Sequence, residues 1–168
     1  MEEKIIQENH KSQKNILPIV KYPHPVLRKK CRKIKNPLDP EIQKLIAEMI
    51  KSMEAHNGMG LAASQVGKSI RLCVIKESEQ LYILINPKIK SQSREKVLGE
   101  EGCLSFPGKF LNIKRSEKVK VRCLNEKGKP VKVKATGLLA RALQHEIDHL
   151  NGILFIDRVG KNLSKKKL

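Results

Sequence analysis

The chain has 168 residues, with 35 Lys and Arg against 17 Asp and Glu, which gives a formal net charge of +18. Hydrophobic residues at 39% and charged residues at 31% fit a folded globular chain and disfavour intrinsic disorder. No run approaches the ~18 consecutive apolar residues of a membrane helix. The polar start MEEKIIQENHKSQKN is unlike a secretory signal. We therefore expect a cytoplasmic protein with no membrane partner.

The length predicts a single domain, because one domain per roughly 100–200 residues is usual. We expect it to span residues 1–168, with a polar N-terminal extension at 1–16 and a basic C-terminal tail at 161–168. The excess of positive charge attracts polyanions. Aromatic residues make up only 3% of the chain, however, which leaves few groups for base stacking. We expect a solvated basic surface and no dedicated nucleic-acid site.

A first helix is predicted to begin after Asp39, which is a favourable N-cap residue. Pro40 suits the first helical position, and Glu41 favours the positive end of the helix dipole. Helical spacing then gives one apolar face, formed by Ile42, Leu45, Ile46, Met49, Ile50 and Met53. The pattern stops near Asn57 and Gly58.

The middle of the chain predicts β structure. Residues 70–76 and 81–87 are rich in branched apolar side chains. Residues 118–124 and 130–136 alternate apolar and basic residues with period two, so we expect one wet face. The loop 125–129 contains Gly and joins the last two strands as a hairpin.

A second helix is predicted over residues 137–150, and it is apolar around most of its circumference. Such a helix is buried, so its inner side chains point into a site built by other segments. At ~100° per residue, that inner sector holds Leu138, Ala142, His145 and His149. The remaining polar stripe consists of Arg141, Gln144, Asp148 and Asn151. We interpret Asp148 as a surface residue.

This helix carries an HExxH sequence, His145-Glu146-Ile147-Asp148-His149. The i, i+4 spacing places His145 and His149 one turn apart on one side, where both can bind one metal ion. Glu146 is offset enough to act as a general base beside the metal. The alternative is a pair of buried histidines satisfied by backbone groups, which is costly beside a buried carboxylate.

A catalytic site of this kind needs a third protein ligand. Cys103, in GEEGCLSFPG (99–108), is the best candidate, because after His149 the chain offers only Asp157. Cys73 and Cys123 lie in strand-like runs and are expected to be small buried residues.

A third segment, GMGLAASQVG (58–67), has glycines that allow close backbone approach and an amide donor in Gln65. A helix stop followed by a plain loop explains this segment equally well.

The motifs GMGLAASQ, EGCLS and QHEIDH resemble, in order and spacing, those of the peptide deformylases. The similarity covers about residues 17–160. It implies an α+β fold with antiparallel sheets packed around a central HExxH helix, forming one catalytic domain. It also implies a metal-dependent hydrolase that removes the formyl group from N-formylmethionyl nascent peptides and releases formate. The implied cofactor is one divalent metal ion, Fe²⁺ in the cell, with Zn²⁺, Ni²⁺ or Co²⁺ able to occupy the site.

The resemblance also implies roles for individual residues. Glu146 is the acid/base, while Gln65 and the backbone N–H of Leu104 hold the developing oxyanion. Gly60 presents backbone groups to an extended substrate. The implied metal ligands are Cys103, His145 and His149.

Two departures from the family pattern stand out. Some bacterial members carry an arginine where this chain has Phe110, so recognition beyond methionine is expected to differ. The chain also has a short basic tail in place of a long C-terminal helix, which suggests weak ribosome contact through its basic surface.

An ion pair of Glu101 with Arg115 behind the site and a surface position for Arg115 are equally compatible with the sequence.

Two other functions remain open from the sequence. The first is a different HExxH hydrolase that cuts ordinary peptide bonds, for which the chain is short. The second is a basic RNA-binding protein with a structural metal ion.

Overall fold

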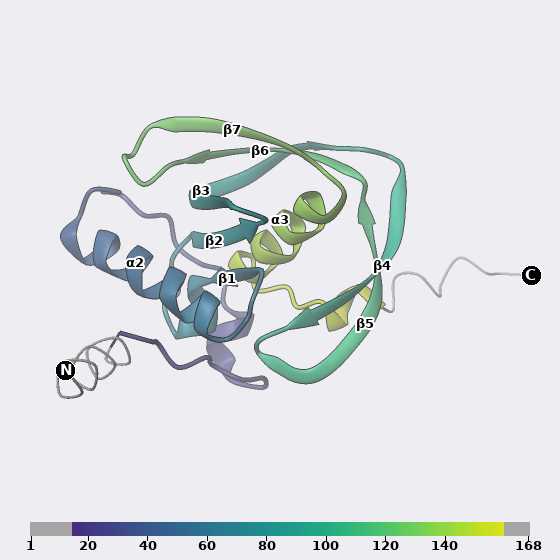
Figure 1. Cartoon of the computed structure of the whole chain (residues 1–168), viewed down its shortest axis with the longest axis horizontal. Helices are drawn as coiled ribbons and strands as arrows, with labels where there is room; N and C mark the ends of the chain where they lie inside the picture. The colour runs from purple at the N-terminus through teal and green to yellow at the C-terminus, as the bar shows by residue number, and fades with distance from the viewer. Residues whose placement is uncertain (1–14, 160–168) are drawn as a thin grey trace, which may run out of the picture.

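A computed structural model describes residues 15–159, which form an α+β domain with two antiparallel sheets (Figure 1). The five-stranded sheet has the order β1-β2-β3-β6-β7. Its strands are β1 (Gly60–Ala62), β2 (Leu72–Glu77), β3 (Gln80–Gln92), β6 (Lys118–Leu124) and β7 (Pro130–Thr136). The two-stranded sheet pairs β4 (Lys96–Cys103) with β5 (Phe106–Ser116). The coarse prediction of an α+β domain with antiparallel sheets is therefore confirmed.

The first predicted helix is α2 (Pro40–Ala55). The Asp39 carboxylate caps it by accepting a hydrogen bond from the backbone N–H of Glu41 at 2.9 Å. The apolar face packs on the five-stranded sheet, where Met49 and Met53 are fully buried against the side chain of Leu72 and its neighbours. Capping and the apolar stripe therefore fix both the helix and the face that it buries.

The hairpin of β6 and β7 is paired in register from Lys118 opposite Thr136 to Leu124 opposite Pro130. Alternate residues of β6 are buried and exposed, as the period-two pattern predicts. The predicted hairpin is confirmed. Its buried side chains pack on α3 (Gly137–Leu150), together with the buried Cys73 and Cys123.

The helix α3 contacts strands of both sheets and the 3₁₀ helix η2 (Ala63–Val66). Figure 1 shows it between the five-stranded sheet and the β4–β5 pair. Its bounds match the predicted 137–150, but the burial of two of its residues differs from the prediction. Leu138 is 59% exposed, although the helical spacing placed it in the inner sector. Asp148 is 7% exposed, although we interpreted it as a surface residue.

The error at Asp148 has a physical cause. Strand β5 covers the polar stripe of α3 and brings its own polar groups with it. Asp148 pairs with the Arg115 guanidinium, and the Gln144 side chain bonds the backbone N–H and carbonyl of Ser116 at 3.0 and 2.9 Å. A polar stripe can be buried when its partners are polar.

The remaining described elements are short: η1 (Pro25–Arg28) and α4 (Ile156–Val159). Within residues 15–159, no helix combines the length and the apolar character needed to cross a membrane. The basic tail at 161–168 lies outside the described residues, as does the N-terminal extension except for residues 15 and 16.

Candidate metal centre and active site

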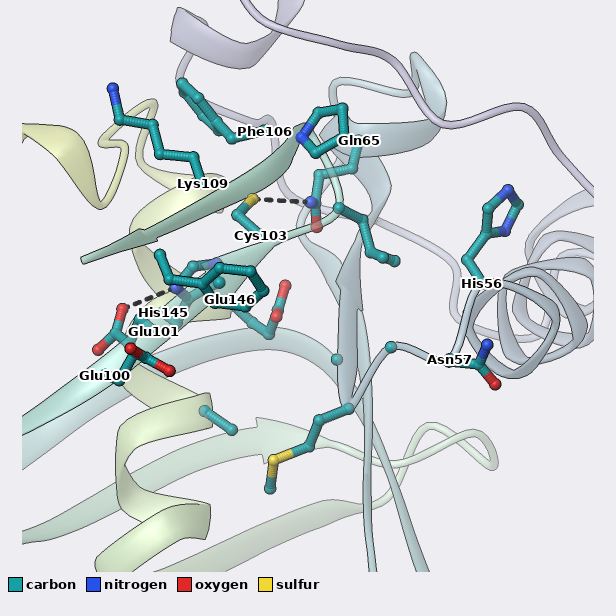
Figure 2. Close-up of a pocket in the computed structure, with 18 of the residues that line it drawn as sticks. His56, Asn57, Gln65, Glu100, Glu101, Cys103, Phe106, Lys109, His145 and Glu146 are labelled. Carbon is teal, nitrogen blue, oxygen red and sulfur yellow. Dashed lines mark hydrogen bonds and ion pairs between the residues drawn. The ribbon is translucent and has the colours of Figure 1, made fainter. Parts of the chain in front are cut away.

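A cavity of about 430 Å³ opens where three segments meet. They are the segment from the end of α2 to η2, the tip of the β4–β5 hairpin, and α3 between Leu138 and Glu146 (Figure 2). All three sequence motifs contribute lining residues, which include Gly60, Gln65, Cys103, Leu104, His145 and Glu146. The fold therefore brings together segments that are far apart in the sequence.

Three possible metal ligands converge at this cavity, and two of them, Cys103 and His145, line it. One donor atom from each of Cys103, His145 and His149 can be chosen so that all lie within 4.8 Å of one another. Cys103 Sγ lies 3.3 Å from His149 Nε2, and the two imidazole centroids are 4.9 Å apart. Both histidines are buried, and Cys103 is half-buried. One thiolate sulfur and two imidazole nitrogens form a donor set that suits a tetrahedral ion with one open position.

Glu146 lies beside this trio and is 4% exposed. Among the described residues, its Oε2 atom has no hydrogen-bond partner, and neither does Nδ1 of His149. Burial away from water raises the pKa of Glu146 to about 7. A carboxylate in this environment is suited to accept and return a proton near neutral pH.

Gln65 is held in one orientation at the wall of the cavity. Its Oε1 accepts a hydrogen bond from the backbone N–H of Ala62 at 2.9 Å, which fixes its Nε2 on the side of Cys103. Nε2 lies 3.2 Å from Ser105 Oγ and 3.4 Å from Cys103 Sγ. The amide therefore presents a donor beside the trio, as Figure 2 shows.

Gly60 begins β1 and faces the carboxylate of Glu146. A Cβ atom added at this glycine would lie 2.4 Å from Glu146 Oε1, far inside contact distance. The missing side chain is therefore what allows the strand to pass so close to Glu146.

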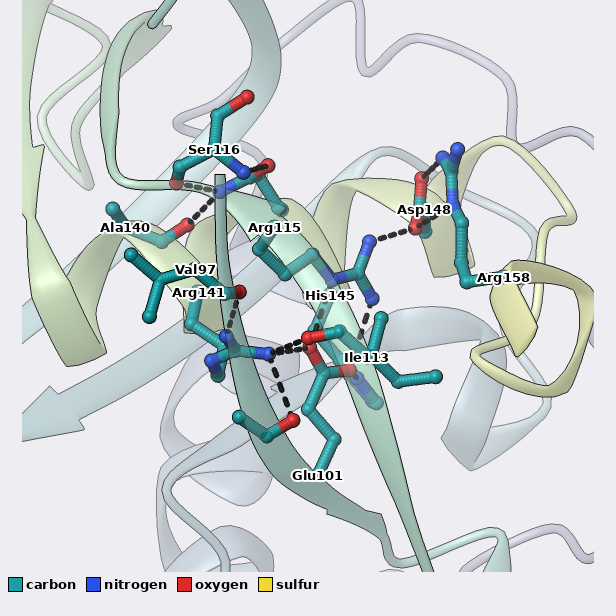
Figure 3. Close-up of polar contacts among 12 residues, drawn as sticks. Val97, Glu101, Ile113, Arg115, Ser116, Ala140, Arg141, His145, Asp148 and Arg158 are labelled. Atoms are coloured by element: carbon teal, nitrogen blue, oxygen red, sulfur yellow. Dashed lines mark hydrogen bonds and ion pairs between the residues drawn. The ribbon is translucent and has the colours of Figure 1, made fainter. Parts of the chain in front are cut away.

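A buried ion network supports the histidine side of the site (Figure 3). Glu101 Oε2 lies 2.9 Å from His145 Nδ1, while its Oε1 accepts from Arg115 at 2.8 Å and from Arg141 at 2.9 Å. Burial alone would raise the pKa of Glu101, but the hydrogen bonds from His145 and Arg115 outweigh it and lower the pKa to about 2. The contact at Nδ1 leaves Nε2 of His145 as the ring nitrogen available to a metal ion.

The network extends along α3 to Asp148, which pairs with both Arg115 and Arg158. Of the two positions that the sequence allowed for Arg115, the buried ion pair with Glu101 is therefore the one observed. Sequence reasoning missed Arg141, which also donates to the backbone carbonyls of Val97 and Ile113 at 2.8 Å. An arginine on a mostly apolar helix was the available signal.

A half-buried sulfur and two buried imidazoles beside an unpartnered carboxylate, on an α+β scaffold, define a metal-dependent hydrolase of the HExxH type. The chain belongs to the polypeptide deformylase family, whose profile matches residues 16–165.

Individual relatives agree with this membership. The chain is 49% identical over 160 residues to the peptide deformylase of Thermodesulfovibrio yellowstonii, with 90% of this chain and 96% of the relative covered. It is 43% identical to peptide deformylase 1 of Bacillus anthracis, with 91% and 98% covered.

Solved structures give the same result. The peptide deformylase of Thermotoga maritima superposes with a TM-score of 0.83 at 42% identity, over 86% of this chain and 97% of that one. A peptide deformylase from Synechococcus elongatus, solved in complex with actinonin, gives a TM-score of 0.83 at 40% identity, with 89% and 85% covered.

Proposed function

We propose that the cavity described above carries out the reaction of the family, the metal-dependent removal of the N-terminal formyl group from newly made polypeptides. The observation that carries the assignment is the Cys103, His145 and His149 trio lying beside the unpartnered carboxylate of Glu146. The substrates are formyl peptides. The products are formate and a peptide with a free N-terminal amine.

The three residues of the trio are proposed to hold one divalent metal ion. Sulfur and imidazole ligands fit zinc and also other first-row metals, and the family resemblance points to ferrous iron in the cell. A bound cation would supply Lewis-acid chemistry, polarising the formyl carbonyl and acidifying water. Its affinity depends on the orientation of His145, which Glu101 fixes at Nδ1.

Glu146 is proposed to move the proton. Its Oε2 accepts a proton as water attacks the formyl carbon, and it then delivers that proton to the departing amine nitrogen. The C–N bond breaks, and the formyl carbon leaves as formate. The raised pKa of Glu146, about 7, matches both halves of this transfer, because the group can be charged for the first and protonated for the second.

Gln65 and the backbone N–H of Leu104 are proposed to stabilise the negative charge that grows on the carbonyl oxygen. The hydrogen bond from the backbone N–H of Ala62 supports this role, since it orients Gln65 so that its Nε2 can donate without reorganisation. One such donor contributes roughly 3–4 kcal/mol to transition-state stabilisation in a well-studied protease.

Gly60 is proposed to present backbone groups to an extended peptide. β1 is at the end of the strand order, so its outer edge has no neighbour among the described strands. A free edge beside the cavity is the feature that β-strand addition uses.

We propose further that α3 is the central helix of a single catalytic domain spanning residues 1–168, and that the enzyme acts in the cytoplasm. The basic tail at 161–168 is proposed to contact the ribosome weakly. Loss of co-sedimentation with ribosomes at low salt, on deletion of residues 161–168, would support the tail contact. Unchanged co-sedimentation would refute it.

The test of the reaction compares three peptides with protein loaded anaerobically with ferrous iron or nickel. Formyl-Met-Ala-Ser should release formate, whereas acetyl-Met-Ala-Ser and unblocked Met-Ala-Ser should stay intact. Cleavage of the unblocked peptide without formate release would instead identify an ordinary HExxH peptidase.

A further inference from the structure

The outer face of the five-stranded sheet carries rows of like charges directly opposite one another. Arg122 of β6 is paired in register with Lys88 of β3 on one side and with Lys132 of β7 on the other. One step along the same face, Lys120 is opposite Lys134. All five side chains are exposed, and we name them the cationic face.

This arrangement is unfavourable for the protein by itself. Like charges directly opposite in a sheet destabilise the strand pairing. Neighbouring strands lie about 4.8 Å apart, well inside the Debye length of about 8 Å at physiological salt. Within residues 15–159, no ion pair involves any member of the cationic face, and the sequences of β3, β6 and β7 contain no Asp or Glu.

A groove of about 680 Å³ adjoins the cationic face. Lys88 and Arg122 belong to the face and also line the groove. Lys30, Lys33 and Lys90 add exposed ammonium groups to it, and none of the described lining residues is acidic. Arg71 also lines the groove and donates to the carbonyl of Pro87 at 2.9 Å and to Asn151 Oδ1 at 2.8 Å, so its charge is held in place without a carboxylate. The positive surface therefore continues from the sheet into a concave site.

We propose that the cationic face and this groove bind the phosphodiester backbone of RNA. A polyanion with one charge per residue would convert the repulsion between the rows into attraction and release its counterions. The scarcity of aromatic residues favours contact with the backbone over base stacking. This inference revises the expectation that the basic surface contains no dedicated nucleic-acid site.

A membrane surface fits the cationic face less well. Basic surfaces that lie on lipid combine charges with apolar side chains that insert. Within residues 15–159, no exposed large apolar side chain belongs to β3, β6 or β7. The exposed large apolar residues all lie elsewhere: Ile16, Tyr22, Leu38, Val97, Leu98, Phe110 and Leu138.

The position of the cationic face leaves the active site open. The buried side of β6 packs against α3, so the face points away from that helix, and the cavity at the metal ligands shares no lining residue with the groove. RNA and a formyl peptide can therefore bind together. This link rests on the proposed function, because newly made polypeptides emerge beside RNA, but binding to RNA itself does not require catalysis.

The test uses the full chain and a labelled 20-nucleotide oligouridylate, followed by fluorescence anisotropy over a salt series. The face variant is K120Q/R122Q/K132Q. The control variant, K44Q/K51Q/K68Q, removes the same charge from exposed positions elsewhere. Both should release formate from formyl-Met-Ala-Ser like the wild type, which keeps failure of the proposed function distinguishable from failure of this inference.

We expect the face variant to bind at least about tenfold more weakly at 50 mM salt, and the control variant less than threefold. Three lost phosphate contacts at about 0.7 each should reduce the slope of log K against log salt by about 2. The face variant should also melt at a higher temperature, because the like-charge rows are gone. Equal losses in both variants would overturn the proposal. So would polyglutamate, or vesicles containing phosphatidylserine, competing as well as RNA at equal charge.

Discussion

The close approach of Gly60 to Glu146 makes Gly60→Ala a sharp probe of the active site. The added Cβ would lie 2.4 Å from Oε1, 2.9 Å from Cδ and 3.0 Å from Cγ of Glu146. Carbon contacts are comfortable near ~3.5 Å, so the carboxylate has to move by about 1 Å. Because Glu146 is buried beside the Cys103, His145 and His149 trio, this movement takes it out of position for the proton transfer proposed above.

A misplacement of this size lowers the rate about 10²-fold, which corresponds to about 2.7 kcal/mol in the activation barrier. We expect the loss in kcat for formate release, with bound metal retained and with a melting temperature close to that of the wild type. The assay is formate release from formyl-Met-Ala-Ser under saturating substrate. Metal content is measured on the same samples.

A double-mutant cycle isolates the cause. In a Glu146→Asp background the side chain is one methylene shorter and only the 3.0 Å contact at the Cγ position remains, so Gly60→Ala should then cost less than about threefold. Full kcat in Gly60→Ala would refute the steric argument. An equal loss in the Glu146→Asp background would show that Gly60 acts through something other than this carboxylate.

Three further changes test other parts of the structure. Glu101→Gln weakens the orientation of His145 and should lower metal affinity about 10–100-fold, measured by competition with a chelator. Burial raises the pKa of Cys123 to about 11, above its ordinary value of 9.0, so its contribution to stability is present below pH 9 and is lost as the pH rises toward 11. Between pH 8 and pH 10.5, the unfolding free energy of the Cys123→Ala variant should therefore fall by about 2 kcal/mol less than that of the wild type. Gly152→Ala places a Cβ 2.4 Å from the carbonyl oxygen of Arg28 at a φ of +72°, and should lower the unfolding free energy in urea by about 2–3 kcal/mol.

Gly152→Ala has a matched control, and each of the three changes has a result that would contradict its reasoning. Gly108→Ala has the same φ of +72° but no atom within 4 Å of the added Cβ, so it should destabilise by only about 1 kcal/mol. Equal losses at the two glycines would contradict the clash at Gly152. Wild-type metal affinity in Glu101→Gln would contradict a role in orienting His145. Identical pH profiles for the wild type and Cys123→Ala would contradict the titration of that thiol.

The parts of the fold that could be predicted are those whose signal is local. The N-cap Asp39 and the apolar stripe of α2 are contained within one segment, and the alternation along β6 and β7 likewise needs no distant partner. Strands β4 and β5 gave no such signal, since their burial follows no regular alternation and they pair only with each other. Their pairing with each other and the packing of β5 on α3 hold them in place.

Asp148 and Arg115 show the same limit within the site. A helical wheel gives the polarity of a stripe but not the chemistry of the strand that covers it. Because β5 supplies Arg115, the stripe is buried with Asp148 inside it. The HExxH spacing placed His145 and His149 on one side of α3, and the nearby position of Cys103 depended on the β4–β5 hairpin.

The most direct test of the account is the Glu146→Gln variant, assayed for formate release and for bound metal in one preparation. The amide keeps the shape of Glu146 but cannot accept the proton. We predict a full complement of metal and a loss of formate release of at least about 10²-fold. Near wild-type formate release from the metal-loaded variant would contradict the assignment of Glu146 and the mechanism built on it.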